Sequence, residues 1–384
     1  MIRDAEILEQ LIANVRRFVR ERLVPLERRV EEEDAIPAEV VAEMRALGLF
    51  GLSIPEAYEG LGLTAEEEML VAFELGFTSP AFRSVVGTNN GIGSQGIIVD
   101  GTEQQKAHWL PQMASGAVVG SFALTEPDAG SDAASLRTTA VRDGDHYVLN
   151  GTKRYITNAP VADLFTVMAR TGGPGAGGIS AFLVPKTSPG LSLGPTDRKM
   201  GQRGTRTCDV VFADCRVPLD SVIGGVEGQG FKTAMKVLDR GRLHISAVCV
   251  GAATRLCEEM VRFARERVQF GKPLAEQQLI QAMIADSATE TFAGRAMVLE
   301  AARSMDGGAR IVREAASAKL FCSEMVGRVA DRAVQVHGGA GYMQDYAVER
   351  FYRDVRLFRL YEGTSQIQQI IIAREMLKAH GNVA

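Results

Sequence analysis

Cysteine is scarce in this chain and shows no pattern. Among 384 residues there are five cysteines, and no two of them have CxxC spacing. They are Cys208, Cys215, Cys249, Cys257 and Cys322. An odd, scattered set argues against a disulfide framework and against a metal cluster. Reduced thiols are typical of a cytoplasm-like compartment. We therefore predict free cysteines and no metal site.

Long hydrophobic runs and an excess of basic residues are also missing. No apolar run approaches the roughly 20 residues that a membrane-spanning helix needs. The first residues, Met1 to Glu6, carry neither a signal-peptide core nor an Arg- and Ser-rich leader. Lysine and arginine number 43 against 47 acidic residues, whereas phosphate binding usually needs a basic excess. These absences predict a cytoplasmic protein without a membrane or nucleic-acid partner.

The periodicity of apolar residues divides the chain into three stretches. Residues 1–118 follow a helical period, residues 119–225 contain alternating runs separated by Gly and Pro, and residues 226–384 return to a helical period. A chain of 384 residues is long enough for two or three domains. We expect an α+β multidomain protein with an N-terminal helical domain, a middle β-domain and a C-terminal helical bundle of four or five helices.

Individual elements follow from the same patterns. Helices are expected over 7–19, 40–49, 66–75, 102–113, 229–268, 275–303, 309–335, 344–358 and 365–380. Strands are expected over 121–125, 136–141, 147–149, 164–169, 179–184 and 208–212. Hairpin turns are expected at Asp143-Gly144-Asp145 and at Asn150-Gly151. The glycine cluster from Gly172 to Gly178 is interpreted as a surface loop, because no helix follows it to form a phosphate site.

One stretch near the C-terminus, Tyr361 to Gln368, combines a carboxylate, a glycine, hydroxyls and amides. Gly363 allows a sharp turn and a close approach of a ligand. Thr364 and Ser365 are suited to cap the helix that follows, whose free N–H groups favour an anion. Glu362 lies on the loop one turn before that helix, where a carboxylate could abstract a proton. The alternative interpretation of Glu362 is an acidic residue that complements the helix dipole. Taken alone, the stretch favours this alternative, a plain helix N-terminus.

Three other stretches accompany it, namely Leu124 to Asp132, Tyr155 to Asn158 and Arg267 to Pro273. Together with Tyr361 to Gln366 they resemble the motifs of the acyl-CoA dehydrogenase family of flavoenzymes, in the family's order and approximate spacing. The resemblance covers nearly the whole chain. It implies the acyl-CoA dehydrogenase fold, with an N-terminal helical domain, a middle β-domain and a C-terminal four-helix bundle. It also implies FAD, an acyl-CoA substrate, electron-transferring flavoprotein as electron acceptor, and a homotetramer.

The chemistry of this family removes two hydrogens across a Cα–Cβ bond. It needs a base for the α-proton and hydrogen bonds that acidify the α-carbon. No side chain accepts a hydride, so a flavin is needed. Glu362 matches the family's catalytic glutamate. Some members carry the base just before the position of Arg242, but Gly241 occupies that place here. We expect bound substrate to raise the pKa of Glu362 toward neutrality.

The resemblance assigns two sets of contacts for the cofactor, one from this chain and one that reaches into a neighbouring subunit. Phe122, Leu124, Thr125, Tyr155 and Thr157 would contact the flavin ring, although many relatives have tryptophan where Tyr155 stands. Ser131 would touch both cofactor and substrate, and Thr364 and Gln366 would meet the pyrophosphate. The residues expected to hold the neighbour's FAD are Arg267, Gln269, Phe270, Gln278, Gln335, Gly338 and Gly339.

The substrate-side positions are Arg83, Ser131, Asp239, Arg242, His244, Gly363 and Arg374. Arg242 and Arg374 have the alternative interpretation of a solvated helix face. His244 is a candidate for the lining of the acyl pocket, and neither it nor His337 is expected to be catalytic. The segment Phe82-Arg83-Ser84 resembles the glutaryl-CoA branch, in which an arginine grips the distal carboxylate of the substrate. It also resembles the sulfinopropionyl-CoA desulfinases. The alternative is a loop arginine in a surface ion pair.

These observations predict flavin-dependent α,β-dehydrogenation of a short-chain acyl-CoA, straight, branched or acid-terminated, to the trans-2-enoyl-CoA. Electrons would pass to electron-transferring flavoprotein. Two alternatives stay open. One is non-oxidative elimination from an acidic acyl-CoA, and the other is a flavin-binding scaffold without turnover. Retention of Glu362 favours dehydrogenation over both.

Overall fold

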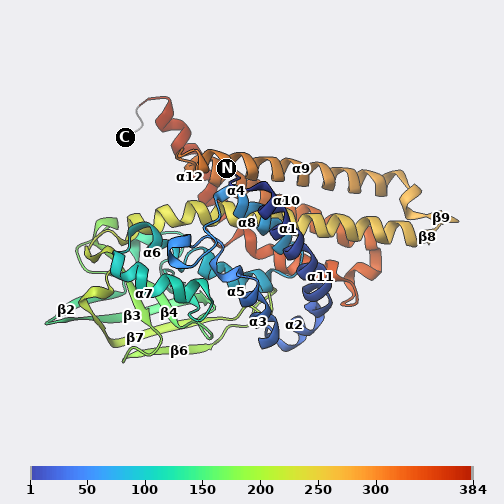
Figure 1. The fold of residues 1–384 in the computed structure, drawn as a ribbon. Helices are drawn as coiled ribbons and strands as arrows, with labels where there is room; N and C mark the ends of the chain where they lie inside the picture. Colours follow the sequence, from blue (N-terminus) through green and yellow to red (C-terminus); the bar gives the residue numbers. More distant parts are fainter. Residues whose placement is uncertain (1, 382–384) are drawn as a thin grey trace.

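The computed structural model describes residues 2–381 and begins with short helices (Figure 1). Their bounds are α1 Ala5–Phe18, α2 Glu27–Glu33, α3 Ala38–Ala46, α4 Ala65–Leu75, α5 Pro80–Asn90, α6 Gln95–Asp100 and α7 Glu103–Ala114. Two of these helices begin with the same N-terminal capping motif. Thr64 and Glu67 form a reciprocal capping box at α4, and Thr102 and Gln105 do so at α7. The helices expected over 7–19, 40–49, 66–75 and 102–113 are confirmed.

A sheet of seven strands follows, within the residues that the structure describes. The strands are β1 Gly120–Ala123, β2 Thr139–Asp143, β3 His146–Thr157, β4 Leu164–Arg170, β5 Ile179–Pro185, β6 Leu191–Thr196 and β7 Thr207–Pro218. Their order is β1-β4-β2-β3-β7-β6, and β5 pairs with β4. All six expected strands are present, and β6 was not foreseen. The surface loop expected at Gly172 to Gly178 is exposed over most of its length and leads directly into β5.

The hairpin expected at Asn150-Gly151 is wrong. The first turn, at Gly144, does join β2 to β3, but β3 then continues without a break through Asn150 and Gly151. A β-bulge against β7 falls between Leu149 and Gly151. A Cβ atom at Gly151 would lie 2.5 Å from the hydroxyl oxygen of Thr138. The glycine is therefore explained by close backbone packing inside a strand.

Long helices form the rest of the molecule. They are α8 Gly230–Glu266, α9 Gln278–Asp306, α10 Val312–His337, α11 Ala347–Asp354 and α12 Ser365–Ala379. Helix α10 packs against α8, α9 and α12, and α8 also packs against α9. A small hairpin of β8 Val268–Gln269 and β9 Lys272–Pro273 joins α8 to α9. Figure 1 shows it at the end of the long helices that points away from the seven-stranded sheet. Between residues 2 and 381, none of the helices is both long and apolar enough to cross a bilayer.

Helix α4 packs closely against the long helix α8, although more than a hundred residues separate the two helices in sequence. Met69 and Phe73 share one apolar core with residues of α8 and α10. A Cβ atom at Gly251 would lie 2.3 Å from the carbonyl oxygen of Phe73, and one at Gly76 would lie 2.5 Å from that of Val248. Only glycine fits at these two positions, because backbone meets backbone there. This contact fixes the last turn of α4 over the middle of α8.

Helix α5 was missed by the sequence analysis, which treated the segment around Arg83 as a loop. Ser79 caps it and Pro80 stands in its first turn. Nearly every residue of α5 is buried, so no polar face marks its period, and it contains Gly87 and two asparagines that are poor helix formers. Arg83 is therefore presented by a packed helix.

Candidate functional site

The loop from Tyr361 to Thr364 enters α12 through two consecutive residues in the left-handed region. Glu362 has φ of +55° and Gly363 has φ of +86°. The first value is uncommon for a residue with a side chain. Buried donors hold this turn, because Lys319 Nζ donates to the Gly363 carbonyl at 2.6 Å and Gln368 Nε2 donates to the carbonyls of both residues. The backbone of the candidate base is thus fixed from two sides.

The helix that follows begins as the sequence predicts. The Thr364 hydroxyl accepts a hydrogen bond from the backbone N–H of Ile367, so Thr364 is the N-cap of α12. Ser365 has another role, since its hydroxyl donates to Glu324 at 2.6 Å. Gln366 lies on the exposed side of the first turn.

The carboxylate of Glu362 is buried and poorly satisfied. Its Oε2 atom has no hydrogen-bond partner among residues 2–381. Burial raises the pKa of Glu362 above its ordinary value, and the positive charges of Arg83, Arg242 and Lys319 partly offset that rise. A buried carboxylate with an unused lone pair and a raised pKa is suited to take up a proton.

Position 241 faces this carboxylate directly. A Cβ atom built on Gly241 would lie 3.0 Å from Oε2 of Glu362. A base at position 241 would occupy the same place, so no second carboxylate competes with Glu362 here. Arg242, the next residue, is 6 % exposed and pairs with Asp239 at 2.7 Å. Its interpretation as a solvated helix face is therefore wrong.

Arg83 lies in the same region, on helix α5. Its Nε donates to Nε2 of His244 at 2.9 Å, and its charge acts on Glu362. Among residues 2–381 no carboxylate forms an ion pair with Arg83. The interpretation as a surface ion pair is wrong. The guanidinium lies over Gly87, where a Cβ atom would come within 2.8 Å of its carbon.

Two β-domain segments expected to contact the flavin ring lie side by side. The backbone N–H of Arg154 donates to the carbonyl of Thr125 at 2.8 Å, and the Ser121 hydroxyl donates to the carbonyl of Thr157 at 2.7 Å. Phe122 and Leu124 belong to the first segment and are partly exposed. Tyr155 stands at a bulge of β3 with φ of +58° and is 60 % exposed. An exposed aromatic face beside two hydroxyls fits an isoalloxazine ring.

A buried lysine supports the first of these segments. Lys153 is fully buried, donates to the carbonyl of Leu124 at 3.1 Å and pairs with Glu126 at 2.7 Å. Burial lowers the pKa of Lys153 to about 8, although the charge of Glu126 opposes this shift. Glu126 also accepts the backbone N–H groups of Arg137 and Thr138. Ser131 lies in the exposed loop between these contacts.

Helix α5 connects this β-domain surface to the carboxylate. Nδ2 of Asn158, at the end of β3, donates to the carbonyl of Ser84 at 2.8 Å and to the hydroxyl of Thr88 at 2.9 Å. Arg83 on the same helix contacts α8, and α8 meets Glu362 at Gly241. Residues from all three stretches of the chain therefore converge on one region.

The remaining candidates do not join this cluster. Those expected to serve a neighbouring subunit are all exposed: Arg267, Gln269, Phe270, Gln278, Gln335, Gly338 and Gly339. They lie in the β8–β9 hairpin and at the adjoining ends of α8, α9 and α10, and Phe270 is 94 % exposed. Arg374 is exposed on α12. His337 is buried and stacks on Phe263 with ring centroids 4.3 Å apart, which is a structural role.

Several residues of the site were not foreseen. Lys319 and Gln368 hold the turn of Glu362, and Glu68 and Arg240 surround His244. Lys319 stands among the apolar positions of α10, and a lysine at such a position could have indicated a buried polar contact. The other contacts join residues far apart in the chain. The five cysteines are free as expected, and residues 2–381 contain no group of ligands able to hold a metal ion.

Comparison with known proteins gives a consistent result over the chain. Residues 5–117, 121–215 and 228–377 match the sequence families described as acyl-CoA dehydrogenase N-terminal domain, middle domain and C-terminal domain. The chain is 41 % identical over 381 residues to an acryloyl-CoA reductase (NADH) of Anaerotignum propionicum, covering 98 % of this chain and 95 % of that one. It is 41 % identical to the CarC subunit of a caffeyl-CoA reductase–Etf complex of Acetobacterium woodii, covering 91 % and 92 %.

The fold is also that of a solved structure. Butyryl-CoA dehydrogenase of Megasphaera elsdenii superposes with a TM-score of 0.94 at 33 % identity, covering 98 % of this chain and 100 % of that one. The expected fold class is thereby confirmed.

Proposed function

We propose, from the premise that this chain belongs to the acyl-CoA dehydrogenase family, that it oxidises a short-chain acyl-CoA to the trans-2-enoyl-CoA with Glu362 as base. The family uses FAD, so the chain is an FAD-dependent oxidoreductase. The observation that carries the proposal is the buried Oε2 of Glu362, which has no hydrogen-bond partner among residues 2–381 and faces Gly241, a residue without a side chain.

The residues of the candidate site have separate parts in the proposed reaction. FAD, when bound, supplies the hydride acceptor. Glu362 takes the α-proton, and its turn is held by Lys319 and Gln368 so that the carboxylate keeps one orientation. Tyr155, Thr125 and Thr157 offer the aromatic face and hydroxyls that would hold the ring. Thr364 caps the start of α12, and the N–H groups of such a helix N-terminus would stabilise a pyrophosphate.

Arg83 supports a substrate with a terminal anion. Its guanidinium has no carboxylate partner among residues 2–381, yet it lies close enough to influence Glu362. An unpaired guanidinium in a partly buried site is costly unless a ligand pairs with it. We therefore propose an acyl group of three to five carbons ending in a carboxylate or sulfinate, bound through two parallel N–H···O contacts.

The remaining parts of the proposal rest on sequence motifs and relatives. The relationship to a subunit of a caffeyl-CoA reductase–Etf complex supports electron-transferring flavoprotein as the partner of this chain. The exposed set around Phe270 supports a homotetramer with shared cofactor sites. We retain the division at residues 118 and 225 and a cytoplasmic location as part of the proposal.

The experiment is an anaerobic titration of the purified flavoprotein with butyryl-, isobutyryl-, succinyl- and glutaryl-CoA, followed by flavin absorbance. A dehydrogenase substrate bleaches the flavin and yields the enoyl-CoA. A desulfinase-like reaction needs a sulfinate on the β-carbon, which none of these four acyl-CoAs carries, so a protein limited to that reaction would give neither bleaching nor product with this panel. An absence of bleaching and of product with every member of the panel would contradict the proposal.

Arg83→Met tests whether Arg83 binds the terminal anion of the acyl group. It keeps volume and removes charge, so preference should shift toward butyryl-CoA. A charge-assisted pair is worth roughly 1.5–3 kcal/mol, which corresponds to a change in specificity of about ten- to a hundredfold. The measurement is kcat/KM for glutaryl-CoA against butyryl-CoA in both proteins. Equal preference before and after the substitution would remove the acidic substrate from the proposal.

A further inference from the structure

His244 lies between two groups that fix its protonation and its hydrogen atoms. Its Nδ1 is 2.9 Å from Oε1 of Glu68, and its Nε2 is 2.9 Å from Nε of Arg83. A guanidinium can only donate a hydrogen bond. Nε2 must therefore be the acceptor and Nδ1 must carry the hydrogen that is donated to Glu68. Only the neutral imidazole, in this one tautomer, satisfies both contacts.

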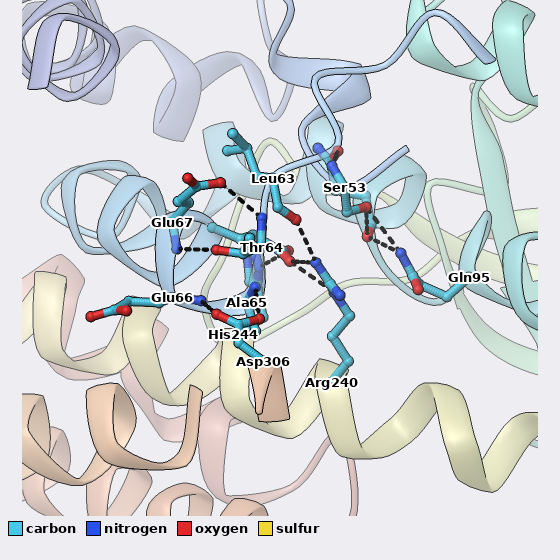
Figure 2. A network of polar contacts seen from close by, with 12 residues as sticks. Ser53, Leu63, Thr64, Ala65, Glu66, Glu67, Gln95, Arg240, His244 and Asp306 are labelled. Atoms are coloured by element: carbon cyan, nitrogen blue, oxygen red, sulfur yellow. Dashed lines mark hydrogen bonds and ion pairs between the residues drawn. The ribbon is translucent and has the colours of Figure 1, made fainter. Parts of the chain in front are cut away.

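Glu68 is itself held in the charged form. It lies on α4, is 1 % exposed, and accepts from Nε and a terminal nitrogen of Arg240. Burial alone would raise the pKa of Glu68, but Arg240 and His244 outweigh burial and hold it at about 2. Figure 2 shows Arg240 reaching from α8 to Leu63, just before α4 begins. The imidazole is thus anchored to a rigid junction of two helices.

The contact with His244 uses only one of the five N–H donors of Arg83. No residue from 2 to 381 accepts a hydrogen bond from the two terminal nitrogens of Arg83. These nitrogens are not among the buried atoms without a partner. Because Gly241 and His244 are three residues apart, they lie on one face of α8. Gly241 faces Glu362 and His244 faces Arg83. The free end of the guanidinium is therefore presented on the side of the candidate base.

We propose that His244, anchored by Glu68 and Arg240, is a positioning residue that holds Arg83 by its Nε and leaves the terminal nitrogens free to receive the anionic end of an acyl-CoA. This inference rests on the proposed role of Arg83. It adds that specificity depends on residues that never touch the substrate. An arginine with a free Nε would have many rotamers to lose on binding, whereas the clamp removes most of that cost in advance.

The test separates the two nitrogens of the imidazole. His244→Asn places an amide N–H near the position of Nδ1, so it retains the contact with Glu68 and loses the acceptor for Arg83. His244→Gln places an amide oxygen near Nε2, so it retains the acceptor. Both are made in the Glu362→Gln holoenzyme, where turnover is blocked. Dissociation constants are measured for glutaryl-CoA and valeryl-CoA, which share a five-carbon chain and differ in the terminal charge, by the change in flavin absorbance.

The readout is the preference for glutaryl-CoA over valeryl-CoA. We expect His244→Asn to lower this preference by about tenfold, as for the loss of one hydrogen bond to a charged group, and His244→Gln to retain it. His244→Leu keeps much of the volume of the imidazole without an acceptor for Arg83 Nε, so it should lower the preference as well, and it serves if His244→Asn does not fold. His337→Asn, at a buried histidine remote from Arg83, should leave the preference unchanged.

The outcomes distinguish the two proposals. If the parent protein shows no preference for glutaryl-CoA, the anion site at Arg83 and the clamp are both wrong. If the parent prefers glutaryl-CoA and Arg83→Met abolishes that preference, the anion site stands. An unchanged preference in His244→Asn, or in His244→Leu if the former does not fold, would then overturn the clamp alone. Equal weakening of both ligands in His244→Asn would also overturn it, because that result indicates a general structural role.

Discussion

At the scale of single residues, the proposed chemistry depends on one carboxylate, Glu362, which is buried and whose pKa is raised by that burial. Glu362→Gln keeps the volume and the hydrogen-bonding backbone, but an amide is not a base. We expect FAD content and ligand binding to stay near those of the parent while flavin reduction slows by about 10²–10⁴-fold. The measurement is single-turnover reduction by butyryl-CoA under anaerobic conditions.

Glu324→Gln is a suitable control for that variant. Glu324 lies on α10 beside the same loop and accepts from Ser365, so it shares the neighbourhood without facing Gly241. Its substitution should affect stability more than the rate of reduction. Reduction of the Glu362→Gln protein at a near-parental rate would mean that the base lies elsewhere.

The pH dependence of reduction follows from the same carboxylate. Burial raises the pKa of Glu362, and only the ionised form accepts a proton. The rate should therefore rise with pH, with a midpoint above the ordinary 4.5. Arg83→Met removes one of the cations that stabilise the ionised form, so its midpoint should lie higher still. Stopped-flow reduction by butyryl-CoA between pH 5 and 9 measures both midpoints, and a lower midpoint in the variant would contradict this account.

The sequence foretold part of this residue-scale picture. The sequence analysis named both Glu362 and the absence of a competing base at Gly241, because they belong to local motifs. The partners of Arg83 were not, since His244 is 161 residues away in the chain. A pattern within one segment carries no information on which side chain from another segment will face it.

At the scale of elements, the site depends on how the turn at Glu362 and Gly363 is held against α10. Lys319 is completely buried, and burial lowers its pKa to about 8. Lys319→Met would keep the apolar stem and leave the Gly363 carbonyl with Gln368 as its remaining donor. A hydrogen bond to a charged group contributes roughly 1.5–3 kcal/mol. We expect a lower melting temperature and slower flavin reduction together.

Lys378→Met provides the matched control for Lys319→Met. Lys378 lies near the end of α12 with its side chain 55 % exposed and pairs with Glu375. Exposed pairs contribute about 0–1 kcal/mol, so thermal melting and stopped-flow reduction should both match the parent. If Lys319→Met behaves like this control in both measurements, the turn does not depend on the buried ammonium.

Prediction of elements from sequence succeeded for the longest helices. The long helices α8, α9 and α10 keep a continuous helical period, and their expected ranges agree with the structure to within a few residues. Helix α5 failed because it is buried on nearly all sides. The turn expected at Asn150-Gly151 failed because a glycine in a strand can serve close packing as well as turning. In both cases tertiary contacts outweighed the local signal.

At the scale of the whole molecule, the site forms where three stretches meet. Asn158 of the β-domain contacts α5, Arg83 of α5 contacts α8, and Gly241 of α8 faces Glu362. The order of helical and strand-rich stretches could be read from the sequence. The convergence could not, because it depends on the docking of α4 and α5 against α8 through contacts that have no local signature.

The β8–β9 hairpin, at the end of α8 and α9 that points away from the sheet, bears on how subunits assemble. Phe270 is 94 % exposed and has φ of +54°, at the tip of a hairpin that points away from the sheet. An exposed aromatic side chain held in this conformation is costly for an isolated chain. A second subunit would cover it. We therefore expect this end to complete a cofactor site in a neighbour, with Arg267 offering its guanidinium to the FAD pyrophosphate.

Arg267→Ala tests the shared site, because one substitution should then change two properties together. FAD content per chain should fall, and the assembly should shift from tetramer toward smaller species, as measured by absorbance and by light scattering after size exclusion. Arg265→Ala is the matched control, since Arg265 is an exposed arginine in the last turn of the same helix. It should change neither property. An Arg267→Ala protein that stays tetrameric with full FAD, or a parental monomer saturated with FAD, would show that each subunit holds its cofactor alone.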